Sequence, residues 1–151
     1  SVWKSEASRI PGNIMGFVSR EEPSTSCTES IDSAASDVAH AWSEAISNHD
    51  VSAYRRLLAP SVRYYKSVKS ADEVTKAKAH SLSKSPGYYQ RIVGDVSAVA
   101  VSASRVRLEF TKAYTLNGVT KNVATVLEVE RDAGGRWLIV VESDRVTERS
   151  Y

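Results

Sequence analysis

The dipeptide Asn117-Gly118 lies between two stretches in which apolar and polar residues alternate, and no other feature constrains the fold of this chain as strongly. Alternation with a period of two is typical of strands with one buried face, and Asn-Gly favours a two-residue type I′ turn. Such a turn fixes which residues face each other across the hairpin. The sequence therefore predicts a hairpin of strands 104–116 and 119–131, in which Lys112 lies opposite Val123.

The same register predicts the surroundings of the charged residues on the outer face of the hairpin. Arg107 falls opposite Glu128, and Arg105 falls opposite Glu130. Opposite charges directly across a ladder attract each other on a solvated face. We therefore interpret the two glutamates as partners in cross-strand ion pairs rather than as the acid and base of an enzyme.

The first half of the chain shows helical spacing of apolar residues. Ser30 is the expected N-cap of the first helix, and Ser70 with Glu73 forms a capping box before the third. The predicted helices are residues 31–48, the short segment from Asp50 to Pro60, and the segment from Ser70 to Pro86-Gly87. The remaining predicted strands are 61–67, 88–101 with a kink at Gly94-Asp95, and 136–146 after a turn at Gly134-Gly135. The expected element order is ααβαββββ.

The last predicted strand is apolar on both faces. Trp137, Ile139 and Val141 point one way, and Leu138 and Val140 point the other. Strands that are apolar on both faces are usually covered on both. The helices cover one face. The other is covered either by residues 1–18 or by a second copy of the chain, and we favour a homodimer through the outer sheet face.

Composition limits the class of protein. The chain has 151 residues, the size of one domain, and its 20 basic and 18 acidic residues give no field that favours nucleic acid. No apolar run approaches the ~20 residues of a membrane span. The single cysteine, Cys27, excludes an intrachain disulfide and a cysteine-based zinc site. We expect a lead-in or docking segment at 1–18, a polar linker at 19–30, one domain at 31–146 and a tail at 147–151.

The histidines do not form a catalytic or metal-binding set. His40 and Asp37 share a helix face, but it is the polar face opposite the apolar stripe, so we expect both to be solvated. His80 lies among the lysines of the third helix, which we also interpret as a solvated face. We predict no catalytic residue, no metal and no cofactor.

The element order and several short motifs resemble the nuclear transport factor 2-like, or SnoaL-like, superfamily over residues 31–146. The motifs are the helix bearing Trp42 followed by Asn48-His49-Asp50, then Leu58-Ala59-Pro60, Val62-Arg-Tyr-Tyr65, Phe110-Thr-Lys-Ala-Tyr114, Lys121 and Gly135-Arg-Trp137-Leu-Ile139. The later motifs are similar to versions appended to bacterial cell-envelope proteins, in which a glutamine stands where this chain has Lys112. The resemblance implies a cone-shaped α+β fold, with three helices packed on a strongly curved, mainly antiparallel sheet around an apolar cavity.

The resemblance also directs the functional expectations. Steroid isomerase-like members carry an aspartate on the first strand, whereas Val62 to Lys66 offers no carboxylate. We therefore expect a non-catalytic module that binds a small ligand or a protein and dimerises, within a longer protein in the bacterial periplasm or secreted. The predicted ligand pocket consists of Trp42, Tyr54, Tyr65, Tyr89, Phe110, Lys112 and Tyr114.

Three alternatives remain open at the level of sequence. The pair Lys112 and Lys121, with Tyr114 on the same face, suits an anionic or glycan-like group. The domain is alternatively an isomerase, dehydratase or cyclase that acts on a hydrophobic small molecule. Its catalytic residues would then be a tyrosine and either Glu142 or Asp95. Glu142 enters the cone if the turn before the last strand is a four-residue loop, and a three-residue loop turns it outward. The third alternative is a structural dimerisation domain with a filled cone.

Overall fold

The computed structural model describes residues 23–144, with side chains from Asp32 onward. The chain divides into two compact units, Ser1–Ser33 and Ala34–Tyr151. All strands and two of the helices belong to the second unit, and helix α1 (Pro23–Ser47) begins in the first. The predicted lead-in segment 1–18 and tail 147–151 lie outside the described residues.

Three helices form where capping residues and apolar spacing favour them. Helix α2 (Val51–Arg56) is capped by Asp50, whose carboxylate accepts the Ala53 N–H at 3.1 Å, and α3 (Ala71–Lys84) has the predicted capping box. Helix α1 begins at Pro23, so the predicted N-cap at Ser30 is wrong. Proline is favoured in the first helical turn because it has no N–H to leave unpaired, which explains the earlier start. None of the helices in the described part of the chain is both long and apolar enough to cross a membrane.

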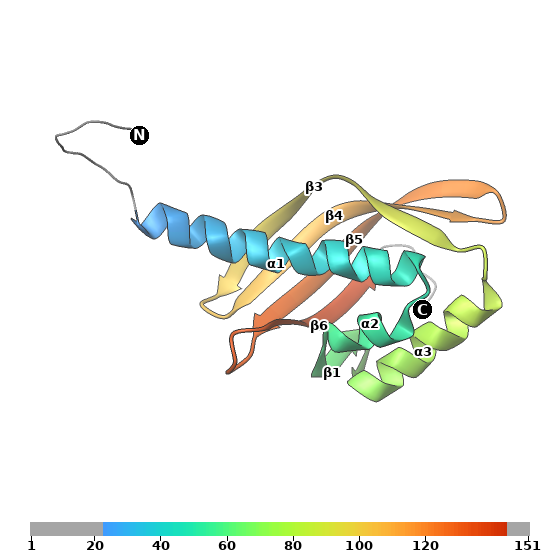
Figure 1. Ribbon diagram of the computed structural model, residues 1–151, viewed down its shortest axis with the longest axis horizontal. Helices are drawn as coiled ribbons and strands as arrows, with labels where there is room; N and C mark the ends of the chain where they lie inside the picture. Colours follow the sequence, from blue (N-terminus) through green and yellow to red (C-terminus); the bar gives the residue numbers. More distant parts are fainter. Residues whose placement is uncertain (1–22, 145–151) are drawn as a thin grey trace. The chain divides into compact units, whose positions relative to one another are not determined.

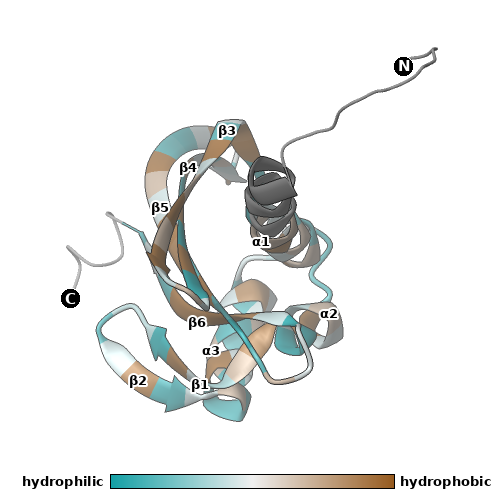
Figure 2. Ribbon diagram, turned by 90° about the vertical axis from the view of Figure 1, so that its left-hand side faces the viewer, coloured by the Kyte–Doolittle hydropathy of each residue, from teal (hydrophilic) through white to brown (hydrophobic). Residues whose placement is uncertain are grey.

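The described strands form one six-stranded sheet in the order β2-β1-β6-β5-β4-β3, of which Figure 1 labels all but β2. Their bounds are Leu58–Tyr64 for β1, Ser67–Ser70 for β2, Tyr89–Ser102 for β3, Arg105–Leu116 for β4, Val119–Arg131 for β5 and Trp137–Asp144 for β6. Among the described strands, only the β1–β6 pairing is parallel. Alternating apolar and polar bands run along the strands (Figure 2). The predicted fold class, α+β with a mainly antiparallel sheet, is confirmed, while the cone shape and strong curvature stay predictions.

Two strand predictions need correction. Strand β1 begins at Leu58, earlier than residue 61, because α2 ends at Arg56 before the proline that was expected to stop it. The predicted strand 61–67 is divided by a turn in which Tyr65 adopts a left-handed backbone with φ 57°. Strand β2 follows this turn and pairs with β1, so the sheet gains an edge strand that the alternation did not reveal.

The hairpin of β4 and β5 confirms the predicted register from Leu116–Val119 to Arg105–Glu130. Asn117 and Gly118 both take positive φ values, 53° and 79°, as a type I′ turn requires. On the outer face Arg107 contacts Glu128 at 3.0 Å, as expected. The predicted Arg105–Glu130 ion pair is wrong, because Arg105 reaches diagonally to Glu128 at 3.4 Å.

Strand β6 departs from regular alternation through a β-bulge. Its turn is a three-residue loop, since the Asp132 N–H donates to the Arg136 carbonyl, and Arg131 then pairs with Trp137. Val129 pairs with Ile139, but Glu128 pairs with Val141, so Val140 is the extra residue. The bulge moves Val141 to the outer face, against the prediction, and turns Glu142 inward despite the three-residue loop.

The core lies between the inner sheet face and the helices. From Ala34 onward, α1 buries a stripe that ends in Trp42 and Ile46, and the Trp42 ring packs edge-on against Phe110 of β4 with centroids 5.7 Å apart. Val62 of β1 and Val74 of α3 extend the same core toward β2. Burial of these side chains fixes the inner face of β4 and β6 against the helices.

We predict that Gly118→Ala lowers the free energy of unfolding by ~1 kcal/mol, because alanine strains the left-handed backbone that closes the hairpin. No atom lies within 4 Å of a Cβ built there, so the cost is one of backbone conformation alone. Urea denaturation measures it. Gly87→Ala is the matched control, because Gly87 has the same free space and no positive φ, and it leaves stability unchanged or slightly higher. Equal losses in both variants would contradict the assigned turn.

Candidate functional site

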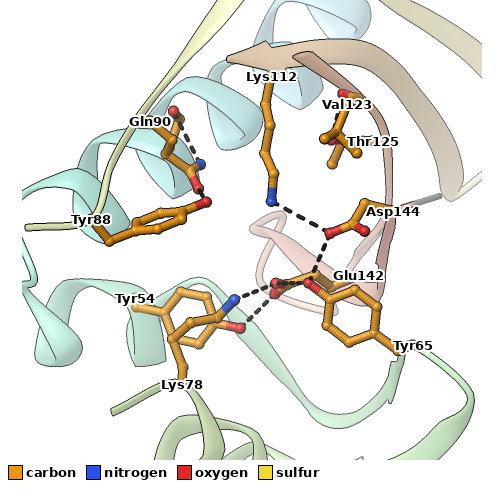
Figure 3. Close-up of polar contacts among 11 residues, drawn as sticks. Tyr54, Tyr65, Lys78, Tyr88, Gln90, Lys112, Val123, Thr125, Glu142 and Asp144 are labelled. Atoms are coloured by element: carbon orange, nitrogen blue, oxygen red, sulfur yellow. Dashed lines mark hydrogen bonds and ion pairs between the residues drawn. The ribbon is translucent and has the colours of Figure 1, made fainter. Parts of the chain in front are cut away.

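Glu142 is the most buried acidic residue of the described chain, with 0% exposure. Its carboxylate accepts hydrogen bonds from the Tyr54 hydroxyl at 2.5 Å, the Lys78 ammonium at 2.7 Å and the Tyr65 hydroxyl at 3.4 Å. The three donors come from α2, α3 and the turn after β1. The carboxylate is therefore held by four separate segments of the fold, β6 included (Figure 3).

Lys78 is buried, and its assignment to a solvated helix face is wrong. It lies four residues after Val74 and four before Leu82, so α3 turns all three toward the core. Its ammonium packs 5.4 Å from the ring centroids of both Tyr54 and Tyr64, in addition to the ion pair. The neighbouring His80 is exposed, as predicted.

The buried ion pair shifts the pKa values of Glu142, Lys78 and the two tyrosines that donate to Glu142. Burial raises the pKa of the Glu142 carboxyl, but the Lys78 charge and the donated hydrogen bonds outweigh it, so the net pKa is lowered. Burial lowers the pKa of Lys78, and Glu142 outweighs it in turn, so that pKa rises. Burial and the glutamate charge together raise the pKa values of Tyr54 and Tyr65. Glu142 is thus ionised at neutral pH and both tyrosines remain hydrogen-bond donors.

A second pair, Lys112 and Asp144, lies beside the first with much looser contacts. The Lys112 ammonium is 3.4 Å from the Asp144 carboxylate, which also accepts from the Tyr65 hydroxyl at 3.3 Å. The ammonium packs 5.7 Å from the Trp42 ring centroid and 5.9 Å from that of Tyr114. Burial and the like charge of Lys78 lower the pKa of Lys112 despite Asp144.

Polar groups at the start of β3 form the opposite wall. The Gln90 side chain accepts the Tyr88 hydroxyl at 2.8 Å and donates to Ser43 at 3.3 Å. Its backbone N–H donates to the Ser47 hydroxyl, and His49 contacts the Tyr88 carbonyl at 2.9 Å. These contacts fix the end of α1 against β3 and leave the Tyr88 ring facing the two lysines (Figure 3).

A cavity of about 280 Å³ lies between these walls. It is lined by Ile46, Tyr64, Tyr65, Lys78, Ser81, Leu82, Ser85, Tyr88, Gln90, Lys112, Leu116 and Asp144. Because Tyr65 has a left-handed backbone, it and Tyr64 both line the cavity although they are adjacent in sequence. Their rings pack edge to face at 4.6 Å. The cavity therefore combines three tyrosine walls with two ammonium groups and one carboxylate.

The seven residues of the predicted pocket are not all brought together. Tyr65 and Lys112 line the cavity. Trp42, Tyr54 and Phe110 lie in the core. Tyr114 is half-buried and stacks on Tyr88 with centroids 5.8 Å apart, while Tyr89 is 52% exposed on the edge strand β3.

The other residues that the sequence suggested for chemistry lie away from the cavity. Asp37, His40, Asp95 and Lys121 are exposed, so Lys121 does not join Lys112 in one site. Within the part of the chain that the structure describes, no three histidine, cysteine or acidic side chains come together in a way that would hold a metal ion. Besides Tyr65 and Lys112, the cavity contains residues that the predicted pocket did not include, among them Lys78, Tyr88, Gln90 and Asp144.

The outer face of the sheet carries a separate hollow of about 660 Å³. It is lined by Ser61, Arg63, Val68, Arg105, Arg107, Val126, Glu128, Glu130, Val140, Val141 and Ser143. Arginines and glutamates alternate across β4 and β5 there, and Val68 on β2 is 75% exposed. This face is partly apolar and carries both signs of charge.

The charges around the inner cavity balance. Lys78 and Lys112 carry two positive charges, and Glu142 and Asp144 carry two negative ones. An added buried anion or cation would have no counter-charge among these four groups, which is costly away from water. The arrangement therefore suits an uncharged molecule that accepts hydrogen bonds.

No protein-family model and no curated protein matches the sequence. Solved structures share the fold. Bdellovibrio bacteriovorus Bd1075 aligns with 82% of this chain at 12% identity and a TM-score of 0.64, and this chain spans only 42% of that protein. A candidate dehydratase of the NTF2-like family from Streptomyces avermitilis aligns over 78% of this chain and 96% of its own at 17% identity and a TM-score of 0.65.

An NTF2-like protein of unknown function from Pseudomonas putida also aligns, over 77% of this chain and 86% of its own, at 10% identity and a TM-score of 0.65. At such identities these likenesses show the fold alone. The chain has the nuclear transport factor 2-like fold that its motifs resemble.

We predict that Glu142→Gln lowers the free energy of unfolding by about 3–5 kcal/mol at pH 7, because it leaves the Lys78 charge buried without a counter-charge. The wild-type protein should lose stability as the pH falls below 4.5, the ordinary glutamate value. A carboxyl whose pKa is lowered by folding stabilises the fold above its unfolded pKa and loses that contribution as acid protonates it. Urea denaturation from pH 7 to pH 3 measures both effects.

Two variants serve as controls for this prediction. Glu44→Gln removes an exposed carboxylate and changes stability by less than about 0.5 kcal/mol. Adding Lys78→Met to Glu142→Gln removes the unpaired charge and restores part of the loss. A double variant no more stable than Glu142→Gln alone would show that the ion pair does not carry the effect.

Proposed function

We propose that the domain binds a small uncharged molecule in the inner cavity without catalytic turnover. The observation that carries this proposal is the coordination of Lys112. Among the described residues its ammonium has one hydrogen-bond acceptor, Asp144, at the long distance of 3.4 Å, although an ammonium carries three donors. Leaving buried donors unmet costs about 1–3 kcal/mol each, so an oxygen atom of a ligand would stabilise this group.

The walls support a specific class of ligand. Tyr64, Tyr65 and Tyr88 present aromatic surface, which suits a flat, unsaturated or aromatic molecule. The volume of about 280 Å³ lies just below that of ordinary ligand pockets, which measure roughly 300–1,000 Å³, so only a compact molecule fits. The balanced charges favour a neutral molecule. Together these features support a compact aromatic amide, alcohol or carbonyl compound.

The contacts of Glu142 argue for binding rather than catalysis. A general base needs a pKa near the working pH and an accessible lone pair. Glu142 already accepts three hydrogen bonds, has a lowered pKa and does not line the cavity. These contacts therefore support a structural role for Glu142.

A proton-transfer enzyme is the second candidate, and one observation favours it. The Asp144 carboxylate and the Tyr65 hydroxyl lie 3.3 Å apart on the cavity wall, where an acid and a base would both meet a ligand. A structural neighbour carries the name of a candidate dehydratase. Turnover of a bound compound that Asp144→Asn abolishes would favour this candidate over simple binding.

The outer sheet face is proposed as the contact surface for a second copy of the chain. Arg105 and Arg107 lie beside Glu128 and Glu130, so two such faces related by a two-fold axis offer each other opposite charges. The exposed Val68 adds apolar surface at the rim of this face. A homodimer would cover the outward residues of β6, among them Val141.

We predict that Ser81→Trp abolishes ligand binding, because Ser81 is exposed at the cavity wall and an indole there fills the space. Ligand-observed NMR with benzamide and related neutral aromatic compounds, compared with benzoate, measures binding. Neutral compounds should bind more tightly than benzoate. Ser83→Trp is the matched control on the same helix, since Ser83 is exposed and does not line the cavity. Equal binding to both variants, or preference for benzoate, would refute the proposed site.

We predict that Val126→Glu converts a dimer to a monomer, because it places an added charge in the middle of the outer hollow. Sedimentation equilibrium measures the mass in solution. Val119→Glu, at the exposed hairpin tip outside this hollow, leaves the mass unchanged. A wild-type protein that is monomeric at high micromolar concentration would contradict the proposed interface.

A further inference from the structure

We infer that Lys112 captures the carbonyl group of a small aromatic aldehyde or ketone as an imine, with Asp144 and Tyr65 as its proton-transfer partners. This inference rests on the proposed function, because the cavity must first admit a small neutral molecule. It adds a covalent step and names the class of ligand. The argument depends on where the lysine lies, how it differs from Lys78, and what surrounds its nitrogen.

The position of Lys112 suits a nucleophile. Its side chain is 8% exposed and its ammonium lies at the cavity wall, packed between the rings of Trp42 and Tyr114. An amine held in this way has little freedom and faces the space that a ligand would fill. A carbonyl oxygen is also the neutral acceptor that the ammonium lacks, so binding brings the carbonyl carbon close to the nitrogen.

Lys78 lines the same cavity but is unsuited to the reaction. Its ammonium is held at 2.7 Å by Glu142, and this ion pair raises its pKa. Only a neutral amine has the lone pair that attacks a carbonyl. Lys112 is the opposite case, because its partner is distant and both burial and Lys78 lower its pKa. The two lysines thus differ in the availability of the neutral form.

The neighbours of Lys112 provide the proton transfers. Asp144, 3.4 Å from the nitrogen, takes one proton from the ammonium. The free amine attacks the carbonyl carbon, so a C–N bond forms and the π bond of the carbonyl breaks. One proton then passes from the nitrogen to the oxygen and gives a neutral carbinolamine. Tyr65, whose hydroxyl donates to Asp144 at 3.3 Å, can relay that proton.

Dehydration completes the imine. Asp144 returns its proton to the carbinolamine oxygen, which leaves as water while the nitrogen lone pair forms the C=N bond. The sum is amine plus carbonyl giving imine plus water, and no oxidant or reductant is consumed. The protonated imine carries the same single positive charge as the ammonium that it replaces. The charge balance of the four buried groups is therefore preserved, with Asp144 still beside the cation.

The experiment treats the intact chain with benzaldehyde and sodium cyanoborohydride at pH 7, which reduces any imine to a stable benzylamine. Peptide mass spectrometry then gives the labelled fraction at each lysine. We expect labelling of Lys112 to exceed that of the exposed Lys66 and Lys121 by at least about tenfold, because the cavity holds the aldehyde beside this one amine. Excess benzamide, which occupies the cavity without forming an imine, should reduce labelling of Lys112 alone.

The controls separate this inference from the proposed function. Ser81→Trp should remove the excess labelling, and Ser83→Trp should keep it. Lys112→Arg should lose the cavity label, with circular dichroism confirming that it folds. Binding of benzamide without preferred labelling of Lys112, or preferred labelling of Lys78, overturns the imine and leaves the binding proposal intact. Failure of benzamide to bind together with absence of labelling overturns both.

Discussion

The ion pair between Lys78 and Glu142 holds together the segments that surround the cavity. Glu142 is 0% exposed and Lys78 is 8% exposed, and removing an ion from water costs several kcal/mol. That cost is offset only because the Glu142 carboxylate also accepts hydrogen bonds from the hydroxyls of Tyr54 and Tyr65. The contact therefore places α2, α3 and the turn after β1 against one point of β6. The cavity has its shape because these segments meet there.

The ion pair in turn depends on the bulge at Val140. A strand that continued the register of its three-residue loop would direct Val141 to the core and Glu142 to solvent. The extra residue reverses the alternation, so Ile139 and Glu142 both face inward. Asp144, two residues later, then falls on the same face as Glu142. One inserted residue thus brings both carboxylates into the interior and leaves Val141 on the outer face.

These dependencies explain how far the sequence could lead. The register of the β4–β5 hairpin was predicted correctly, because a two-residue turn fixes register locally and every later pair follows from it. The kink at Gly94-Asp95 was likewise predicted, and the register between β3 and β4 shifts there. The bulge at Val140 has no comparable sequence signal, because valine is common in regular strands. Only the pairing of β6 with β5 in the structure reveals the bulge. The inward direction of Glu142 was for that reason undecided.

The candidate site was less predictable than the fold for a related reason. Lys78 has the helical spacing of a core residue, between Val74 and Leu82, and that spacing could have revealed its burial. We predicted an exposed Lys78 instead, because a lysine side chain is rarely buried unless it is paired. The partner, Glu142, lies 64 residues away in sequence and faces it only through the bulge. Local patterns therefore predicted the elements, while the charged centre arose from their packing.

The two buried lysines show how one cluster can separate structure from chemistry. Lys78 and Lys112 line the same cavity, and each has a carboxylate partner. The Lys78 ammonium lies 2.7 Å from Glu142, which also accepts hydrogen bonds from two tyrosines. The Lys112 ammonium lies 3.4 Å from Asp144, which also accepts a hydrogen bond from Tyr65. The tighter pair stabilises the interior charge, since its geometry is fixed by four segments. The looser contact, between Lys112 and Asp144, is the one that the proposed ligand would meet. An imine formed there from a neutral carbonyl compound would keep the net charge of the interior.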